Sequence, residues 1–183
     1  MDFAKVFKFI IEKFRQEKID FAIIGGFALQ FSGITRATRD IDLLVLSQDS
    51  PKIKDILVNC GYKLIHESED VLNFISENPQ LGRIDFLLAH REYSREMLKR
   101  ATEKEIFSSK LRIKVISIED QIGLKVQSSS NDPSRQAQDM ADIELLIKNN
   151  YPNLDVELLK EYFDLFDRRT ELNKIIERLK NVK

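Results

Sequence analysis

The sequence predicts an α/β (α+β) fold, with a small mixed sheet flanked by helices and a helical C-terminal part. Short apolar runs typical of buried strands occur at residues 21–24, 41–46 and 83–88. Segments with apolar residues at helical spacing lie around these runs, and beyond residue 117 the spacing is helical only. We therefore divide the chain into a core at residues 1–116 and a helical part at residues 117–183 that packs on it.

The elements of the N-terminal half follow from local signals. Apolar residues at helical spacing predict a helix at residues 3–18. A short apolar run predicts a strand at 21–24, and a short helix that ends at Gly33 is expected at 27–31. Ser50-Pro51 is a typical helix start, and Gly61 ends that helix. Two strands are expected at residues 62–66 and 71–76, and a third at 83–88.

The C-terminal half begins with a charged helix at residues 91–102 and a hairpin at 106–116 that turns at Ser108-Ser109. Ser117 and Asp120 then form a helix-start pattern. Residues 128–133 resemble a linker between this helix and the next, at 135–148. Two further amphipathic helices are expected in residues 151–183.

Composition is that of an ordinary globular protein. Of 183 residues, 43% are hydrophobic and 32% are charged. The formal net charge is −1, so the overall charge does not indicate a polyanionic partner. The single cysteine, Cys60, has no partner for an internal disulfide bond. Charged residues interrupt the apolar N-terminal residues, and no apolar run approaches the length of a membrane span. We expect a cytoplasmic protein without a membrane partner.

An Asp-x-Asp pattern opens the strand at residues 41–46. Because residues two apart on a strand share a face, Asp40 and Asp42 point one way while Ile41 and Leu43 point the other. Two adjacent carboxylates repel each other unless a cation or a shared proton relieves them, and hard oxygen ligands suit Mg²⁺. Salt bridges within the fold are the alternative interpretation.

A Gly-Gly turn precedes this strand. Gly25 and Gly26 follow one strand and precede a helix, where a backbone without side chains can come close to a phosphate group. A phosphate-binding turn next to a carboxylate pair suggests chemistry on a nucleoside triphosphate. Asp85, inside the apolar strand at 83–88, is costly to bury unless it is paired or binds a metal.

Gly25-Gly26 with the run from Arg36 to Asp42 (RATRDID) resembles the signature of the DNA polymerase beta-like nucleotidyltransferase superfamily. The R-x-T-x-D-I-D form is similar to its small prokaryotic AbiEii-like branch, the abortive-infection toxins. This resemblance implies that residues 1–116 form the catalytic core and that Asp85 is the third carboxylate. The sequence departs from the superfamily in having Gly-Gly rather than Gly-Ser, and no basic side chain in the residues that follow.

The resemblance implies Mg²⁺-dependent transfer of a nucleoside monophosphate from a triphosphate such as ATP to an acceptor hydroxyl. Asp40 and Asp42 would bind one Mg²⁺ with the triphosphate, and Asp85 would share a second ion and is also the candidate general base. The acceptor could be tRNA, a protein or a small molecule. The same resemblance suggests a toxin of a toxin–antitoxin system, with an antitoxin protein as partner.

Basic residues are candidates for contacts with the triphosphate. Arg36 suits a phosphate contact, although charge balance beside the carboxylates explains it as well, and Arg39 is left without a role. Thr38 is a candidate for orienting the strand or touching phosphate. By resemblance to the AbiEii-like pattern, Lys125 would contact the triphosphate or pyrophosphate, against the alternative of an ordinary surface lysine. Asp139 would pair with Lys125, and Asp142 would brace the fold.

Two other functions remain open. A catalytically inactive nucleotidyltransferase-like domain would bind nucleotide or a protein partner without turnover, although such a module has no need of three aspartates. A metal-dependent phosphodiesterase would also use carboxylates, but it leaves the Gly-Gly turn unexplained.

Overall fold

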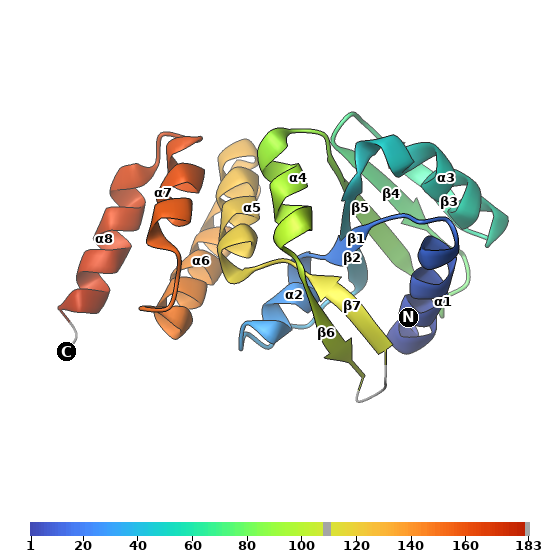
Figure 1. The fold of residues 1–183 in the computed structure, drawn as a ribbon, viewed down its shortest axis with the longest axis horizontal. Coiled ribbons are helices and arrows are strands. Elements are labelled where there is room, and N and C mark those ends of the chain that lie inside the picture. The colour runs from blue at the N-terminus through green and yellow to red at the C-terminus, as the bar shows by residue number, and fades with distance from the viewer. Residues whose placement is uncertain (108–110, 182–183) are drawn as a thin grey trace. The chain divides into compact units, whose positions relative to one another are not determined.

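The computed structural model describes residues 1–107 and 111–181, so the turn expected at Ser108-Ser109 lies outside the described residues. Within these residues, seven strands form one mixed sheet in the order β3-β4-β5-β2-β1-β7-β6 (Figure 1). The strands are β1 (Phe21–Ile23), β2 (Asp40–Leu46), β3 (Lys63–Glu67), β4 (Val71–Ile75), β5 (Arg83–Ala89), β6 (Thr102–Ile106) and β7 (Leu111–Val115). The helices are α1 (Phe3–Gln16), α2 (Gly25–Phe31), α3 (Ser50–Asn59), α4 (Glu92–Arg100), α5 (Ile118–Asn131), α6 (Gln136–Asn150), α7 (Val156–Asp164) and α8 (Arg169–Lys180), with short 3₁₀ turns at Ser47–Asp49 and Pro133–Arg135.

The sheet confirms the predicted mixed α/β class. β2 pairs with β5, and β1 with β7, in parallel, whereas the other neighbouring strands are antiparallel. β2 lies between β5 and β1, and four of its seven residues are buried. The apolar run after Asp42 predicts such a strand, with neighbouring strands on both sides and apolar residues on both faces.

One face of the sheet forms the main hydrophobic core. Ile41, Leu43 and Phe86 are almost fully buried there, together with the apolar stripe of α1 and residues of α3. Aromatic rings fill much of this layer, as where Phe14 contacts Phe21 edge-on. Figure 1 shows α1 and α3 on the same side of the strands. Side chains that alternate with the core residues, including the aspartates, therefore point to the opposite face.

The chain forms two compact units. The first consists of residues 1–29 and 36–117, and the second of residues 30–35 and 118–183. In the second unit, α5 packs against α6 and α7, and α7 packs against α8. Its core includes Leu146, Leu159, Phe163 and Leu172, all fully buried. The assignment of catalysis to residues 1–116 stays a prediction.

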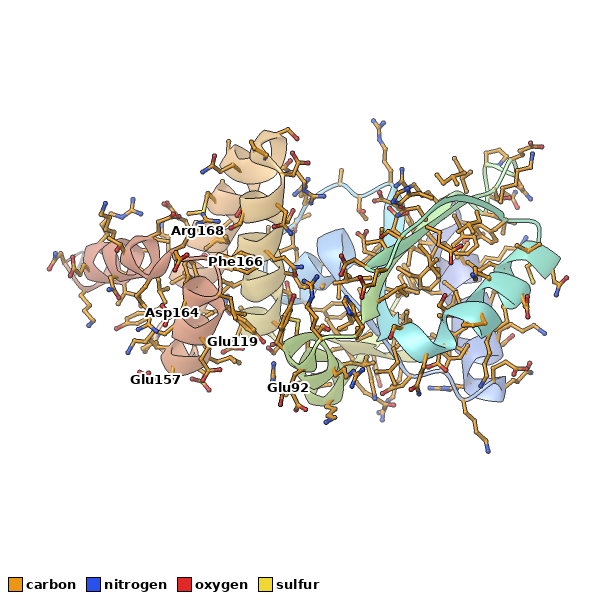
Figure 2. All side chains as sticks on the ribbon, turned by 90° about the horizontal axis from the view of Figure 1, so that it is seen from above. Glu92, Glu119, Glu157, Asp164, Phe166 and Arg168 are labelled. Carbon is orange, nitrogen blue, oxygen red and sulfur yellow. The ribbon has the colours of Figure 1, made fainter. Side chains whose placement is uncertain are left out.

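The linker expected at residues 128–133 is wrong for most of its length, because α5 continues to Asn131. The hydroxyls of Ser129 and Ser130 donate to the carbonyl of Val126, one turn back in the helix. Arg168, labelled in Figure 2, donates in turn to both hydroxyls, at 2.6 Å and 3.0 Å. Tertiary contacts thus hold a serine run in a helix that local propensity disfavours.

No helix in the described part of the chain combines the length and apolar character that crossing a membrane requires.

Candidate active site

The three predicted carboxylates are brought together by strand register. Asp40 and Asp42 lie on β2, and the parallel pairing of β2 with β5 places Asp42 directly opposite Asp85. The alternating residues Ile41, Leu43 and Ile84 are fully buried on the other face. Each of the three carboxylates offers an oxygen, and these oxygens lie within 4.8 Å of one another.

This donor set fits a divalent metal ion. The three aspartates are partly buried, and each provides the hard oxygen ligand that Mg²⁺ prefers. Oxygens on opposite sides of one Mg²⁺ lie roughly 4 Å apart, so small side-chain rotations are enough to close the set around an ion. Three carboxylates at this spacing repel one another unless positive charge is brought in. The arrangement can therefore hold a metal ion.

Gly25 and Gly26 lie against the aspartate strand. Gly25 has a φ of +61°, and a β-carbon there would meet the Asp42 carboxylate, with Oδ2 at 2.1 Å. A β-carbon on Gly26 would lie 2.8 Å from Cβ of Thr38. The structure thus gives both glycines a steric reason that the sequence did not reveal. Helix α2 begins at Gly25 itself, two residues earlier than expected.

Thr38 positions Asp40. Its hydroxyl lies 3.1 Å from both the backbone carbonyl and the carboxylate Oδ1 of Asp40. Of the two roles considered from sequence, orientation of the strand is the one with a visible contact. A phosphate contact by Thr38 remains a prediction.

Arg83 is the residue of this site that the sequence analysis missed. Its Nε donates to both carboxylate oxygens of Asp85, at 2.8 Å and 2.9 Å. The hydrogen bond to Asp85 raises the pKa of the Arg83 guanidinium; burial opposes the rise, and the charges of Asp85, Asp40 and Asp42 add to it. The signal was available, because residues 83 and 85 are two apart on one strand and share a face.

The loop arginines differ in exposure. Arg36 is partly buried and engaged in an interaction, whereas Arg39, immediately before Asp40, is exposed. The phosphate contact expected of Arg36 stays a prediction.

Lys125 belongs to the helical unit, where it is held between two carboxylates. Its Nζ lies 3.0 Å from Oδ1 of Asp139 and 2.6 Å from Oδ2 of Asp142. Asp139 is 2% exposed and also lies 3.4 Å from Nε of Arg135. The pairing expected with Asp139 is present and extends to Asp142, so Lys125 is part of a largely buried ion cluster rather than a solvated surface lysine. Contact with a triphosphate remains a prediction.

Comparison with known proteins confirms the resemblance. Residues 12–182 match the family described as "Nucleotidyl transferase AbiEii toxin, Type IV TA system". This range includes both glycines, the three aspartates and Lys125. No curated protein matches the sequence.

Solved structures of nucleotidyltransferases share the fold. The antibiotic-resistance factor ANT(2'')-Ia has a TM-score of 0.66 at 15% identity, over 97% of this chain and 99% of its own. The lincosamide antibiotic adenylyltransferase LnuA, solved with lincomycin bound, has 0.55 at 20% identity, over 78% and 94%. An antigenic nucleotidyltransferase-like protein from Paracoccidioides brasiliensis has 0.57 at 18% identity, over 95% and 91%. At these identities the likeness establishes the architecture and leaves the substrates open.

Proposed function

The chain belongs to the AbiEii nucleotidyl transferase family, and on this premise we propose that it transfers a nucleoside monophosphate from a triphosphate to an acceptor hydroxyl, with Mg²⁺, in the cytoplasm. The observation that carries the proposal is the register of β2 and β5, which brings Asp40, Asp42 and Asp85 within 4.8 Å of one another. A binding module has no need of three carboxylates gathered on one sheet face.

The carboxylates have distinct roles in this proposal. Asp40 and Asp42 would hold an ion that enters with the triphosphate, and Asp85 would help to hold a second ion. When bound, Mg²⁺ supplies positive charge that stabilises the oxygens on which negative charge develops. The Thr38 hydroxyl fixes the Asp40 carboxylate, so its direction is set before the ion arrives.

The triphosphate would lie on the β1 side of the aspartates. The Asp42 carboxylate takes the space that a β-carbon of Gly25 would fill, and phosphate oxygens would approach the backbone N–H groups at the start of α2. We assign Gly25, Gly26, Arg36 and Thr38 to triphosphate binding, with the arginine as counter-charge. The contact of Lys125 with the triphosphate is a separate prediction that rests on the family resemblance alone.

The chemical step follows from these placements. The acceptor oxygen forms a bond to the α-phosphorus while the bond from that phosphorus to the bridging oxygen breaks, and pyrophosphate leaves. The acceptor proton passes to the Asp85 carboxylate acting as general base. Asp85 suits the role of general base because it lies on β5, whereas the glycine turn that would bind the triphosphate follows β1, on the other side of β2.

The acceptor is the open part of the proposal. The family description names a toxin, and among the structural neighbours one is named an antibiotic-resistance factor and another a lincosamide antibiotic adenylyltransferase. We propose tRNA, a protein or a small molecule as the acceptor class. The toxin role would bring an antitoxin protein as partner. Induced expression of the wild-type chain should then stop growth, whereas an Asp42→Asn variant should not.

The direct test follows α-³²P label from each of the four nucleoside triphosphates into total tRNA, a cell extract, the protein itself, and aminoglycoside and lincosamide antibiotics. Label should move with Mg²⁺, and stop with EDTA or in Asp40→Asn and Asp42→Asn. Asp55→Asn is the matched control, since Asp55 is an exposed aspartate on α3. Nucleotide and metal binding without transfer to any acceptor would favour the alternative, an inactive domain that binds nucleotide or a partner.

A further inference from the structure

Four side chains form a two-by-two patch on the aspartate face of the sheet. The parallel register of β2 and β5 places Asp40 opposite Arg83 and Asp42 opposite Asp85. Since residues two apart share a face, all four side chains point to the same side. The patch thus combines three carboxylates with one guanidinium, and its net charge is negative.

The guanidinium engages the carboxylate that the proposed second ion needs. Nε of Arg83 lies 2.8 Å from Oδ1 and 2.9 Å from Oδ2 of Asp85, so it lies across both oxygens of that carboxylate. A metal ion at Asp85 needs at least one of the same oxygens. The remaining lone pairs of Asp85 could still bind an ion, but two cations on one carboxylate repel each other, so Arg83 opposes metal binding there.

The exposure of the two partners shows which one can move. The Asp85 side chain is 18% exposed, whereas that of Arg83 is 44% exposed. Asp85 is confined by its strand and its neighbours, but the long arginine side chain borders solvent and can rotate away. Exposed or half-exposed ion pairs contribute little net free energy, so a divalent ion can break this one.

Building on the proposed function, we propose that Arg83 is a positioning residue that occupies Asp85 as a built-in counter-cation and weakens metal binding at that carboxylate. Before the ion arrives, the guanidinium holds Asp85 beside Asp42 and limits repulsion within the triad. Metal binding at Asp85 is stronger once Arg83 has rotated away, so while the ion pair is formed Asp85 has the weakest metal affinity of the three carboxylates.

The test measures metal binding rather than turnover. Mn²⁺ is titrated into the full-length protein and free Mn²⁺ is followed by electron paramagnetic resonance, with and without an ATP analogue that carries a methylene group between the α- and β-phosphorus. The Asp85-dependent part of binding is defined as the part lost in Asp85→Asn. Thermal unfolding checks that each variant is folded.

Arg83→Gln removes the charge and should raise the Mn²⁺ affinity of the Asp85-dependent part about fivefold, a change on the scale of a half-exposed ion pair. Arg83→Lys keeps the charge without the fixed guanidinium geometry and should give a smaller gain. Arg39→Gln is the matched control. It removes a charge adjacent in sequence to Asp40, but Arg39 is exposed and forms no hydrogen bond or ion pair with Asp85 among the described residues.

The outcomes separate the two proposals. Equal Mn²⁺ affinity in the wild type, Arg83→Gln and Arg83→Lys would overturn the role of Arg83 and leave the proposed function standing. The same gain in Arg39→Gln would also overturn it, since any nearby charge would then act alike. Absence of Mn²⁺ binding in every protein, even with the analogue, would overturn the proposed function and this inference together.

Discussion

Gly25 packs directly on Asp42, so closely that a β-carbon at residue 25 would lie 2.1 Å from Oδ2 of that carboxylate. The glycine also has a φ of +61°, in the left-handed region that other residues rarely adopt. Two separate physical reasons, steric space and backbone conformation, therefore require glycine at this position.

Gly25→Ala should lower the free energy of unfolding by about 1 to 3 kcal/mol and weaken Mn²⁺ binding, because the new methyl group displaces the Asp42 carboxylate. Urea unfolding and Mn²⁺ titration measure the two effects. Gly61→Ala is the matched control: its φ is +87°, but nothing lies within 4 Å of the added methyl group. It should destabilise by about 1 kcal/mol and leave Mn²⁺ affinity unchanged. Equal Mn²⁺ affinity in both variants would contradict the steric argument.

Thr38→Val keeps the shape of the side chain but removes the hydroxyl that lies 3.1 Å from Oδ1 of Asp40. We expect the rate of nucleotidyl transfer to fall about tenfold, the lower end of the losses seen when groups that orient metal ligands are removed. Thr38→Ser retains the hydroxyl and should stay close to the wild-type rate. Steady-state kinetics at saturating triphosphate measure the effect, and equal rates in the two variants would argue against an orienting role.

Lys125→Met should lower the free energy of unfolding by about 3 kcal/mol, because it removes the cation between Asp139 and Asp142 from a largely buried cluster. Urea unfolding gives the value. Arg178→Met is the control, since Arg178 pairs with Glu144 on the exposed surface, and its loss should be below about 1 kcal/mol. Near-equal losses would show that the cluster contributes little, and would favour a direct role for Lys125 in binding substrate.

Tyr62 should make stability fall at alkaline pH. Burial, with electrostatic repulsion from the neighbouring Cys60 as a smaller cause, raises the pKa of the Tyr62 hydroxyl from 10.0 to about 12. Because the folded protein holds this proton more tightly than the unfolded chain, its stabilising contribution is complete below pH 10 and is lost as the pH rises towards 12. The side chain is 2% exposed, so the loss should be about 2 kcal/mol.

The comparison for Tyr62 is Tyr62→Phe, which cannot ionise and lacks the hydrogen bond to the carbonyl of Leu81. Urea unfolding between pH 9 and 12 should show the wild type losing its advantage over the variant as the pH rises. A constant difference between the two proteins across this range would contradict the shift.

The carboxylates and the sheet were predictable from sequence because their signals are local. Strand alternation sets the direction of Asp40 and Asp42, and an aspartate inside the apolar run of residues 83–88 is conspicuous. The register that places Asp85 opposite Asp42 was not predictable, because it depends on pairing between segments far apart in the chain. The contact of Gly25 with Asp42 depends on the same long-range placement.

The misreadings have physical causes as well. Serine favours turns, so the serine run predicts a linker, yet Arg168, from a distant part of the sequence, donates to the hydroxyls of Ser129 and Ser130 within the helix. The place of Arg83 in the site follows from strand alternation, because residues 83 and 85 share a face and Nε of Arg83 contacts the Asp85 carboxylate.

The pairing of β2 with β5 also sets when the site can come into existence during synthesis. The two strands are separated in the chain by α3, β3 and β4, so the loop between them must close before Asp42 and Asp85 meet. A growing or truncated chain that ends before β5 carries two of the three carboxylates and cannot assemble the set. The three-carboxylate set can therefore form only after β5 has been synthesised, while β6 and β7 have still to follow.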